Sequence, residues 1–140
     1  MVAMNTLTLL GFDFGMRHIG VAIGQTITKT ASSLTTLTAY QSQTPWAEIC
    51  RLIEQWAPDA LVVGLPIDMR EQETFITIAA KDFAAQLQQR FKLPVHLIDE
   101  KLSSKEARAL LVEQGIKLDK ANIDKMAAQL ILQSWLNNQT

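Results

Sequence analysis

Three carboxylates stand where the surrounding sequence predicts shared chemistry. Asp13 interrupts the apolar stretch LTLLGFDFG, Glu100 ends the apolar run VHLIDE, and Asp124 lies near the start of the last predicted helix. An ionised carboxylate in apolar surroundings costs several kcal/mol unless a charged or hydrogen-bonding group pairs with it. Asp13 therefore needs a partner, for which Arg17 or a turn amide would be the simplest choice.

A shared cation would explain all three acids at once. Carboxylates brought together from distant parts of a chain repel one another and raise one another's pKa unless a cation neutralises them. A site built only from oxygen ligands suits Mg²⁺ or Mn²⁺, which indicates metal-assisted phosphodiester chemistry. Each acid also has a simpler interpretation. Asp124 alone fits a helix N-terminal charge favoured by the dipole, and Glu100 with Lys101 fits an exposed ion pair.

The elements that would position these acids follow from hydrophobic periodicity. Short apolar runs predict five strands, at 6–12, 19–24, 30–37, 60–66 and 95–100. The second and third strands are close enough in sequence to pair as a hairpin, and the first, fourth and fifth are expected to lie parallel. This order predicts an α/β fold with the hairpin at one edge of the sheet. Asp13 and Glu100 then stand at the carboxyl ends of parallel strands, where open α/β sheets bind ligands.

Helical spacing predicts four helices. Thr44 is expected to cap the first helix and Pro45 to occupy its first turn, with apolar residues at helical spacing turned to the core. A long helix ends near residue 91, and SSKE at 103–106 has the pattern of a capping box at the start of a third. The last helix is expected from about 122 to 136, with Asp124 in its first turn. The predicted apolar face of the first helix consists of Trp46, Ile49, Cys50, Ile53, Trp56 and Ala57.

Composition limits the protein class. The chain has 140 residues, of which 48% are hydrophobic, and this predicts one compact domain over 1–140. Because the formal net charge is −1, binding to nucleic acid would need a local basic patch rather than a general positive field. The single Cys50 cannot form an internal disulfide, and no stretch predicts a leader or a membrane span. We therefore expect a cytoplasmic protein without a membrane partner.

Four stretches resemble a known family in both order and spacing. They are GFDFGMRHIGVAIG, VVGLPIDM, DEKLSSKEA and IDKMAAQLILQSWL, which together extend over essentially the whole chain. They resemble the conserved blocks of the YqgF family, bacterial RNase H-like proteins regarded as pre-16S rRNA nucleases and related to Holliday junction resolvases. The resemblance implies an RNase H-like fold with a mixed five-stranded sheet flanked by helices. It also implies a metal-dependent endonuclease of ribosome maturation that acts at the 5′ end of the 16S rRNA precursor.

The resemblance assigns roles to individual residues. The catalytic and metal-binding aspartate of the first strand corresponds to Asp13, the family glutamate to Glu100, and the aspartate of the last helix to Asp124. Two Mg²⁺ or Mn²⁺ ions are implied, with Asp13 shared between them. Asp99 precedes Glu100 in a strand, so its side chain is expected to face away and to support rather than catalyse.

This sequence departs from the family pattern at four places. Met16 and His18 flank a retained basic residue after the first strand, and Lys101 replaces an arginine whose planar fork can grip a phosphate with two hydrogen bonds. Asp68 stands where many members have asparagine, and the simplest interpretation is a solvated loop acid. These changes affect substrate grip and loop shape more than the acidic centre.

Basic residues near the acids are candidates for nucleic-acid binding. These are Arg17, Lys101, Lys105 and Arg108, of which Lys105 and Arg108 share one side of a helix. Each of them, taken singly, is also explained as an ordinary solvating charge.

The sequence leaves other functions open. A Holliday junction substrate would present the same phosphodiesters, and two matched cuts usually imply a symmetric dimer. The oligomeric state, monomer or weak homodimer, is not determined by the sequence. An RNA-binding assembly module without catalysis is a further alternative. A nucleotide-binding domain of the sugar kinase and actin type is disfavoured, because its cleft needs two such domains.

Overall fold

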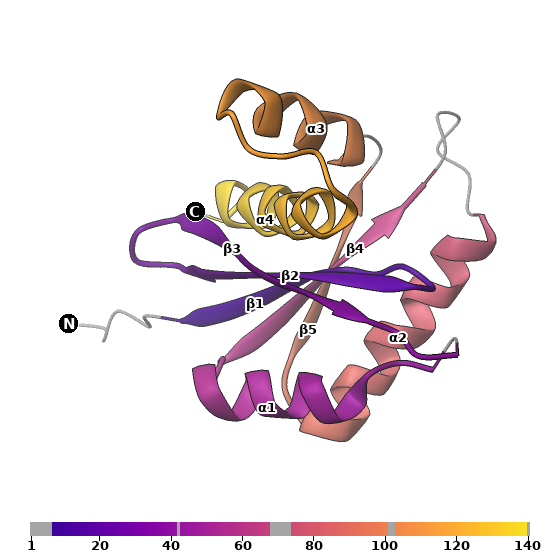
Figure 1. Cartoon of the computed structure of the whole chain (residues 1–140). Helices are drawn as coiled ribbons and strands as arrows, with labels where there is room; N and C mark the ends of the chain where they lie inside the picture. The colour runs from indigo at the N-terminus through magenta and orange to yellow at the C-terminus, as the bar shows by residue number, and fades with distance from the viewer. Residues whose placement is uncertain (1–6, 42, 68–73, 101–102, 140) are drawn as a thin grey trace.

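A mixed five-stranded sheet forms the centre of the protein (Figure 1). The computed structural model describes residues 7–41, 43–67, 74–100 and 103–139. The strands follow in the sheet order β3-β2-β1-β4-β5. Their bounds are β1 (Thr8–Asp13), β2 (His18–Gln25), β3 (Thr30–Thr38), β4 (Ala60–Pro66) and β5 (Val95–Glu100). β2 pairs antiparallel with β1 and β3, whereas β1, β4 and β5 are parallel, so the predicted topology is confirmed.

Helices cover both faces of this sheet. One face carries α1 (Trp46–Trp56) and α2 (Phe75–Phe91), and the other carries α4 (Lys120–Asn137) (Figure 1). α3 (Ser103–Glu113) lies outside α4 and packs against it through a separate small core. None of the helices in the described part of the chain has the length and apolar character needed to cross a membrane.

Large side chains fill the core between the sheet and the α1 and α2 helices. Phe83 of α2 is 2% exposed and lies at the centre of an aromatic cluster. Its ring centroid is 5.7 Å from Phe12, 4.8 Å from Phe14 and 5.6 Å from Trp46. Such pairs add about 0.5–1.5 kcal/mol each beyond their buried area. This face is therefore held by aromatic packing.

The opposite face is held by a close approach of α4. A Cβ atom at Gly20 of β2 would lie 1.9 Å from the backbone oxygen of Asp124, so only glycine fits there. At Gly64 of β4 a Cβ would lie 2.6 Å from the Cδ1 atom of Ile131. Glycines of β2 and β4 thus let α4 approach the sheet closely, over an apolar core of its own.

Some local predictions are wrong. Thr44 does not cap α1, because the N-cap residue is Pro45 and no side chain bonds to the first turn. The α1 stripe is also shifted, since Cys50 is exposed and Trp56 is 36% exposed, while Leu52 packs against the core in their place. The capping box at 103–106 depends on a side chain outside the described residues.

The start of α4 also differs from the expectation. The helix begins at Lys120, because the side chain of Asp119 accepts a hydrogen bond of 2.8 Å from the amide of Asn122. Asp124 therefore lies in the second turn rather than the first. A charge in the second turn gains little from the helix dipole, whose effect falls off within the first turn. The simple N-terminal interpretation of Asp124 is accordingly wrong.

Candidate active site

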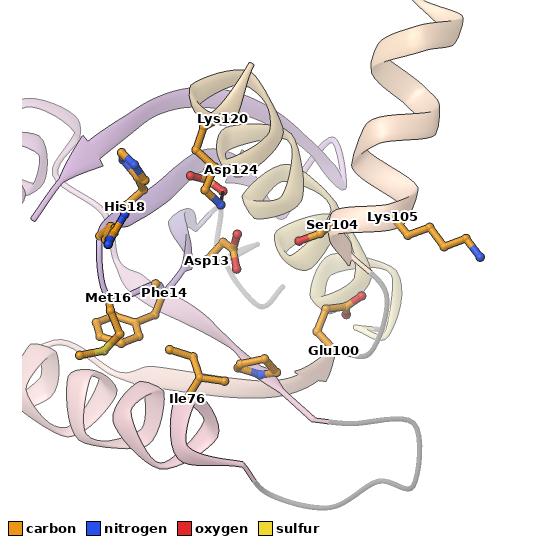
Figure 2. Close-up of a pocket in the computed structure, with 13 residues that line it drawn as sticks. Asp13, Phe14, Met16, His18, Ile76, Glu100, Ser104, Lys105, Lys120 and Asp124 are labelled. Carbon is orange, nitrogen blue, oxygen red and sulfur yellow. Dashed lines mark hydrogen bonds and ion pairs between the residues drawn. The ribbon is translucent and has the colours of Figure 1, made fainter. Parts of the chain in front are cut away.

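A pocket of about 870 Å³ opens at the edge of the sheet where β1 and β5 end (Figure 2). All three predicted carboxylates line it, although they come from β1, β5 and α4. Four further lining residues have nitrogen-bearing side chains, namely Arg17, His18, Lys105 and Lys120. The rest of the wall consists of Phe14, Gly15, Met16, Pro66, Ile76 and Ser104. The structure therefore brings the three acids to one pocket, while their catalytic role stays a prediction.

Strand register places two of the carboxylates. Asp13 is the last residue of β1 and pairs with Gly64 of the parallel strand β4. Glu100 ends β5 and pairs with Pro66 at the end of β4. Because parallel strands end at the same edge of a sheet, both acids project from that edge, as the strand pattern predicts.

The close approach of α4 places the third carboxylate. Gly20 admits the backbone of Asp124, and the side chains of Gln129 and Gln133 accept hydrogen bonds of 2.9 and 3.0 Å from amides of the edge strand β3. These contacts fix α4 along the sheet as well as above it. As a result Asp124 is only 4% exposed, at the inner wall of the pocket.

Asp124 has one paired oxygen and one unpaired oxygen. Its Oδ1 atom accepts a hydrogen bond of 2.7 Å from the ammonium of Lys120, one turn earlier in the helix. Its Oδ2 atom is buried and has no hydrogen-bond partner among the described residues. A buried polar atom without a partner costs free energy and usually has an explanation in function.

The pKa values of Asp13 and Glu100 are both raised by burial and by negatively charged neighbours. Burial, the negative charge of Asp124 and, to a smaller extent, that of Glu100 outweigh the opposing charge of Lys120 and together raise the pKa of Asp13 to about 7. Burial also raises the pKa of Glu100, with a contribution from Glu106 of α3. Raised acid pKa values in a pocket mark candidate functional sites.

The donor set fits a hard divalent cation. It consists of carboxylate oxygens, one of which is the unpaired Oδ2 of Asp124, and oxygen is the ligand that Mg²⁺ and Mn²⁺ prefer. As the side chains stand, no three Asp, Glu, His or Cys residues in the described part of the chain are arranged to hold one ion. Joint binding would therefore require rotation of the carboxylates, and the ammonium of Lys120 supplies the positive charge beside Asp124.

The predicted nucleic-acid contacts are distributed unevenly. Arg17 and Lys105 are exposed and line the pocket, and the Lys105 side chain extends away from the carboxylates (Figure 2). Arg108 is exposed one turn further along α3 and does not line the pocket. Lys101 lies outside the described residues.

Of the residues that depart from the family pattern, some line the pocket and others do not. Met16 and His18 line the pocket beside Asp13. Asp99 is exposed and does not line it, which agrees with the expected strand alternation. Asp68 lies outside the described residues.

Lys120 is the site residue that the sequence analysis missed. Its spacing of four residues from Asp124 was visible in the sequence, and that spacing brings two side chains together on one face of a helix. A helix that begins near residue 122, as apolar spacing predicts, would leave Lys120 outside that face.

Comparison with known proteins now adds to this geometry. The sequence profile described as "RuvX: Holliday junction resolvase" matches residues 7–138 of the chain. The chain belongs to the RuvX family. The YqgF resemblance predicted from the four sequence blocks is thereby confirmed, and the family is one of nucleases and resolvases.

Close relatives of this RuvX-family chain carry one name. A protein of Nitrosococcus oceani called "Putative pre-16S rRNA nuclease" is 48% identical over 132 residues, covering 94% of this chain and 87% of that protein. A relative of the same name from Legionella pneumophila is 50% identical over 129 residues, covering 91% and 93%. A third, from Coxiella burnetii, is 46% identical over 135 residues, covering 96% of each chain.

Solved structures show the fold of the RuvX-family chain. T. thermophilus RuvC, in a complex with a Holliday junction substrate, matches with a TM-score of 0.55 and 17% identity over 94% of each chain. The Fowlpox virus resolvase in complex with junction DNA matches with a TM-score of 0.58 and 9% identity, covering 94% of this chain and 97% of that one. The predicted RNase H-like fold is confirmed by these matches.

Proposed function

We propose that this protein is a metal-dependent endonuclease that hydrolyses phosphodiester bonds in precursor 16S rRNA, at its 5′ end. The observation that carries the proposal is the single pocket that carboxylates from β1, β5 and α4 all line (Figure 2). The names of the relatives that are 46–50% identical support the choice of substrate.

The carboxylates would act as ligands. Asp13, Glu100 and Asp124 would together hold the two divalent ions. Bound ions of this kind activate a water molecule and stabilise the leaving oxygen. The residues of the chain hold the site in place: β1 and β5 fix two of the acids, and Gly20 lets α4 bring the third.

Two cations at the pocket would bind the substrate backbone. Arg17 follows β1 and Lys105 lies on α3, so they approach the pocket from different elements. Contacts of basic side chains with phosphates position a nucleic acid without reading its sequence. Phe14, Met16 and Ile76 provide apolar wall in the same pocket.

A four-way DNA junction is the second candidate substrate. The family profile is described as a Holliday junction resolvase, and this observation favours it. Two symmetric cuts in a junction would require two copies of the pocket related by a two-fold axis.

A side-by-side cleavage assay would test the proposal. Precursor 16S RNA and a synthetic four-way DNA junction would be incubated with the protein in Mg²⁺ or in Mn²⁺, with Asp13→Asn as the control. We expect cleavage of the RNA near the mature 5′ end by the parent and a loss of at least about a hundredfold in the variant. Cleavage of the junction alone would show that the four-way DNA junction, and not the precursor RNA, is the substrate. RNA binding without any cleavage, or equal rates in parent and variant, would contradict the proposal.

A further inference from the structure

Lys120 occupies a position that helix energetics alone does not favour. It is the first residue of α4, where the positive end of the helix dipole disfavours a cation. It also precedes its acidic partner Asp124 by four residues, and this order of charges stabilises a helix less than the reverse. The reason for a lysine here must therefore lie outside the helix.

The pocket supplies that reason. Lys120 contacts Oδ1 of Asp124 at 2.7 Å, and its positive charge also lowers the pKa of Asp13. It thus faces two of the three acids that the proposed function assigns to metal binding. The Lys120 side chain is 63% exposed while that of Asp124 is 5% exposed, so the lysine has open space into which it can withdraw.

We propose that Lys120 is a counter-ion built into the chain, which a divalent ion must displace from Asp124. This inference rests on the proposed metal site and adds to it a residue that sets metal affinity. Lys120 is then a positioning residue: it holds Asp124 and reduces repulsion among the acids until a cation takes over that role. Because Oδ2 of Asp124 is buried and Lys120 occupies Oδ1, displacement of Lys120 would free Oδ1 for the cation.

Displacement predicts a change in the reactivity of the Lys120 amine. Reductive methylation of the parent protein, read residue by residue in a mass spectrometer, should be slow at Lys120 in chelator and several-fold faster in saturating Mg²⁺. Lys125, the next lysine of α4, lines a different groove beside β3 and α3 and should be modified at the same rate in both conditions. An unchanged rate at Lys120 would contradict displacement. This measurement needs no variant.

Competition also predicts an effect on metal affinity. Lys120→Met removes the charge and keeps a long, helix-compatible side chain, so the Kd for Mg²⁺ or Mn²⁺ measured by calorimetry should fall about three- to tenfold. Lys120→Arg keeps a cation and should bind metal as the parent does. Lys125→Met is the matched control for loss of one charge from the same helix, and its Kd should stay within about twofold of the parent value.

Stability gives a third readout. In chelator, Lys120→Met should unfold at a lower temperature than the parent, because the acids lose their counter-ion, and saturating Mg²⁺ should raise its Tm by more than it raises that of the parent. If Lys120→Met fails to fold even with Mg²⁺, Lys120→Gln and the methylation experiment decide the question. Equal or weaker metal binding by the folded variant would overturn the inference.

Failure of the inference can be told apart from failure of the proposed function. Cleavage that depends on Asp13, with metal affinity and methylation insensitive to Lys120, would leave the nuclease assignment standing and remove the counter-ion. Displacement of Lys120 by metal in a protein that cleaves neither substrate would do the opposite. If the parent binds neither Mg²⁺ nor Mn²⁺ in the calorimeter, both are wrong.

Discussion

The two faces of the sheet are packed by different means, and the difference separates stability from chemistry. The face under α1 and α2 is filled by large rings around Phe83, of which Phe14 also lines the wall of the pocket. The face under α4 relies on glycine, which brings the helix backbone against β2 at Gly20. The backbone that carries Asp124 is thereby fixed relative to β2, because the contact is made by backbone atoms that cannot change rotamer.

The α4 face also carries an electrostatic cost that the aromatic face lacks. Asp13 and Asp124 lie close enough to raise the pKa of Asp13, and one oxygen of Asp124 is buried without a partner. Functional sites commonly retain such local conflicts, which the rest of the fold must offset. The aromatic core around Phe83 is one source of that stabilisation.

Gly20→Ala should have the largest effect. Its new Cβ would lie 1.9 Å from the backbone oxygen of Asp124, where no side-chain rotation can relieve the clash. We expect a loss of more than about 4 kcal/mol in unfolding free energy, or failure to fold, together with loss of Mg²⁺ binding. Denaturant titration and calorimetry would measure both.

Gly64→Ala is the matched control for this substitution. Its Cβ would lie 2.6 to 3.1 Å from three side-chain atoms of the buried Ile131, which can repack where a backbone oxygen cannot, so the cost should be smaller than at Gly20, about 1–3 kcal/mol. If the two alanine variants were equally stable, the backbone contact at Gly20 would not be what fixes α4.

Asp13→Asn should stabilise the metal-free protein above neutral pH. The folded pKa of Asp13 is about 7 against an ordinary value of 3.8, so the native state binds more protons between these values and the parent loses stability as pH rises from about 4 to about 7. The variant lacks this loss, so its free energy of unfolding at pH 8 should exceed that of the parent by about 2–4 kcal/mol. Urea titrations in chelator at pH 4.5 and pH 8 would check it. A variant less stable than the parent at pH 8 would contradict the charge crowding inferred for the pocket.

Phe83→Leu tests the other face. Loss of the ring interactions with a partly filled cavity should cost about 1–2 kcal/mol of unfolding free energy. Because Phe83 does not line the pocket and carries no oxygen ligand, the Kd for Mg²⁺ should be unchanged. A weakened metal site in a variant that remains folded would show that the two faces are coupled.

Removal of helix caps should have the smallest effects and still distinguish the faces. Thr74 caps α2 by accepting a hydrogen bond from the amide of Thr77, and Asp119 caps α4. Thr74→Ala and Asp119→Ala should each cost about 1 kcal/mol in thermal or urea unfolding. Only Asp119→Ala should speed the methylation of Lys120 in chelator, because it frays the first turn of α4. Equal methylation rates of Lys120 in both variants would show that the Asp119 cap does not hold Lys120 in place.

The periodic spacing of apolar residues predicts most of the fold. Five strands and four helices follow from apolar spacing, and the edge shared by Asp13 and Glu100 follows from their places at the ends of parallel strands. The errors occur where local signals compete. Thr44 has the right type for a cap, but Pro45 takes the N-cap position, and Asp119 caps α4, which begins at Lys120, two residues earlier than apolar spacing predicts.

The sequence by itself determined the family, the sheet topology and the three acids, because each of these depends on residue type and spacing along the chain. The three-dimensional contacts of the acids, and the positive charge that offsets their repulsion, follow only from the tertiary structure. The approach of α4 at Gly20, the unpaired oxygen of Asp124 and the reach of Lys120 into the pocket all depend on distances between elements. Spacing along a chain cannot supply those distances, since a clash or an ion pair is decided by a few tenths of an ångström in space.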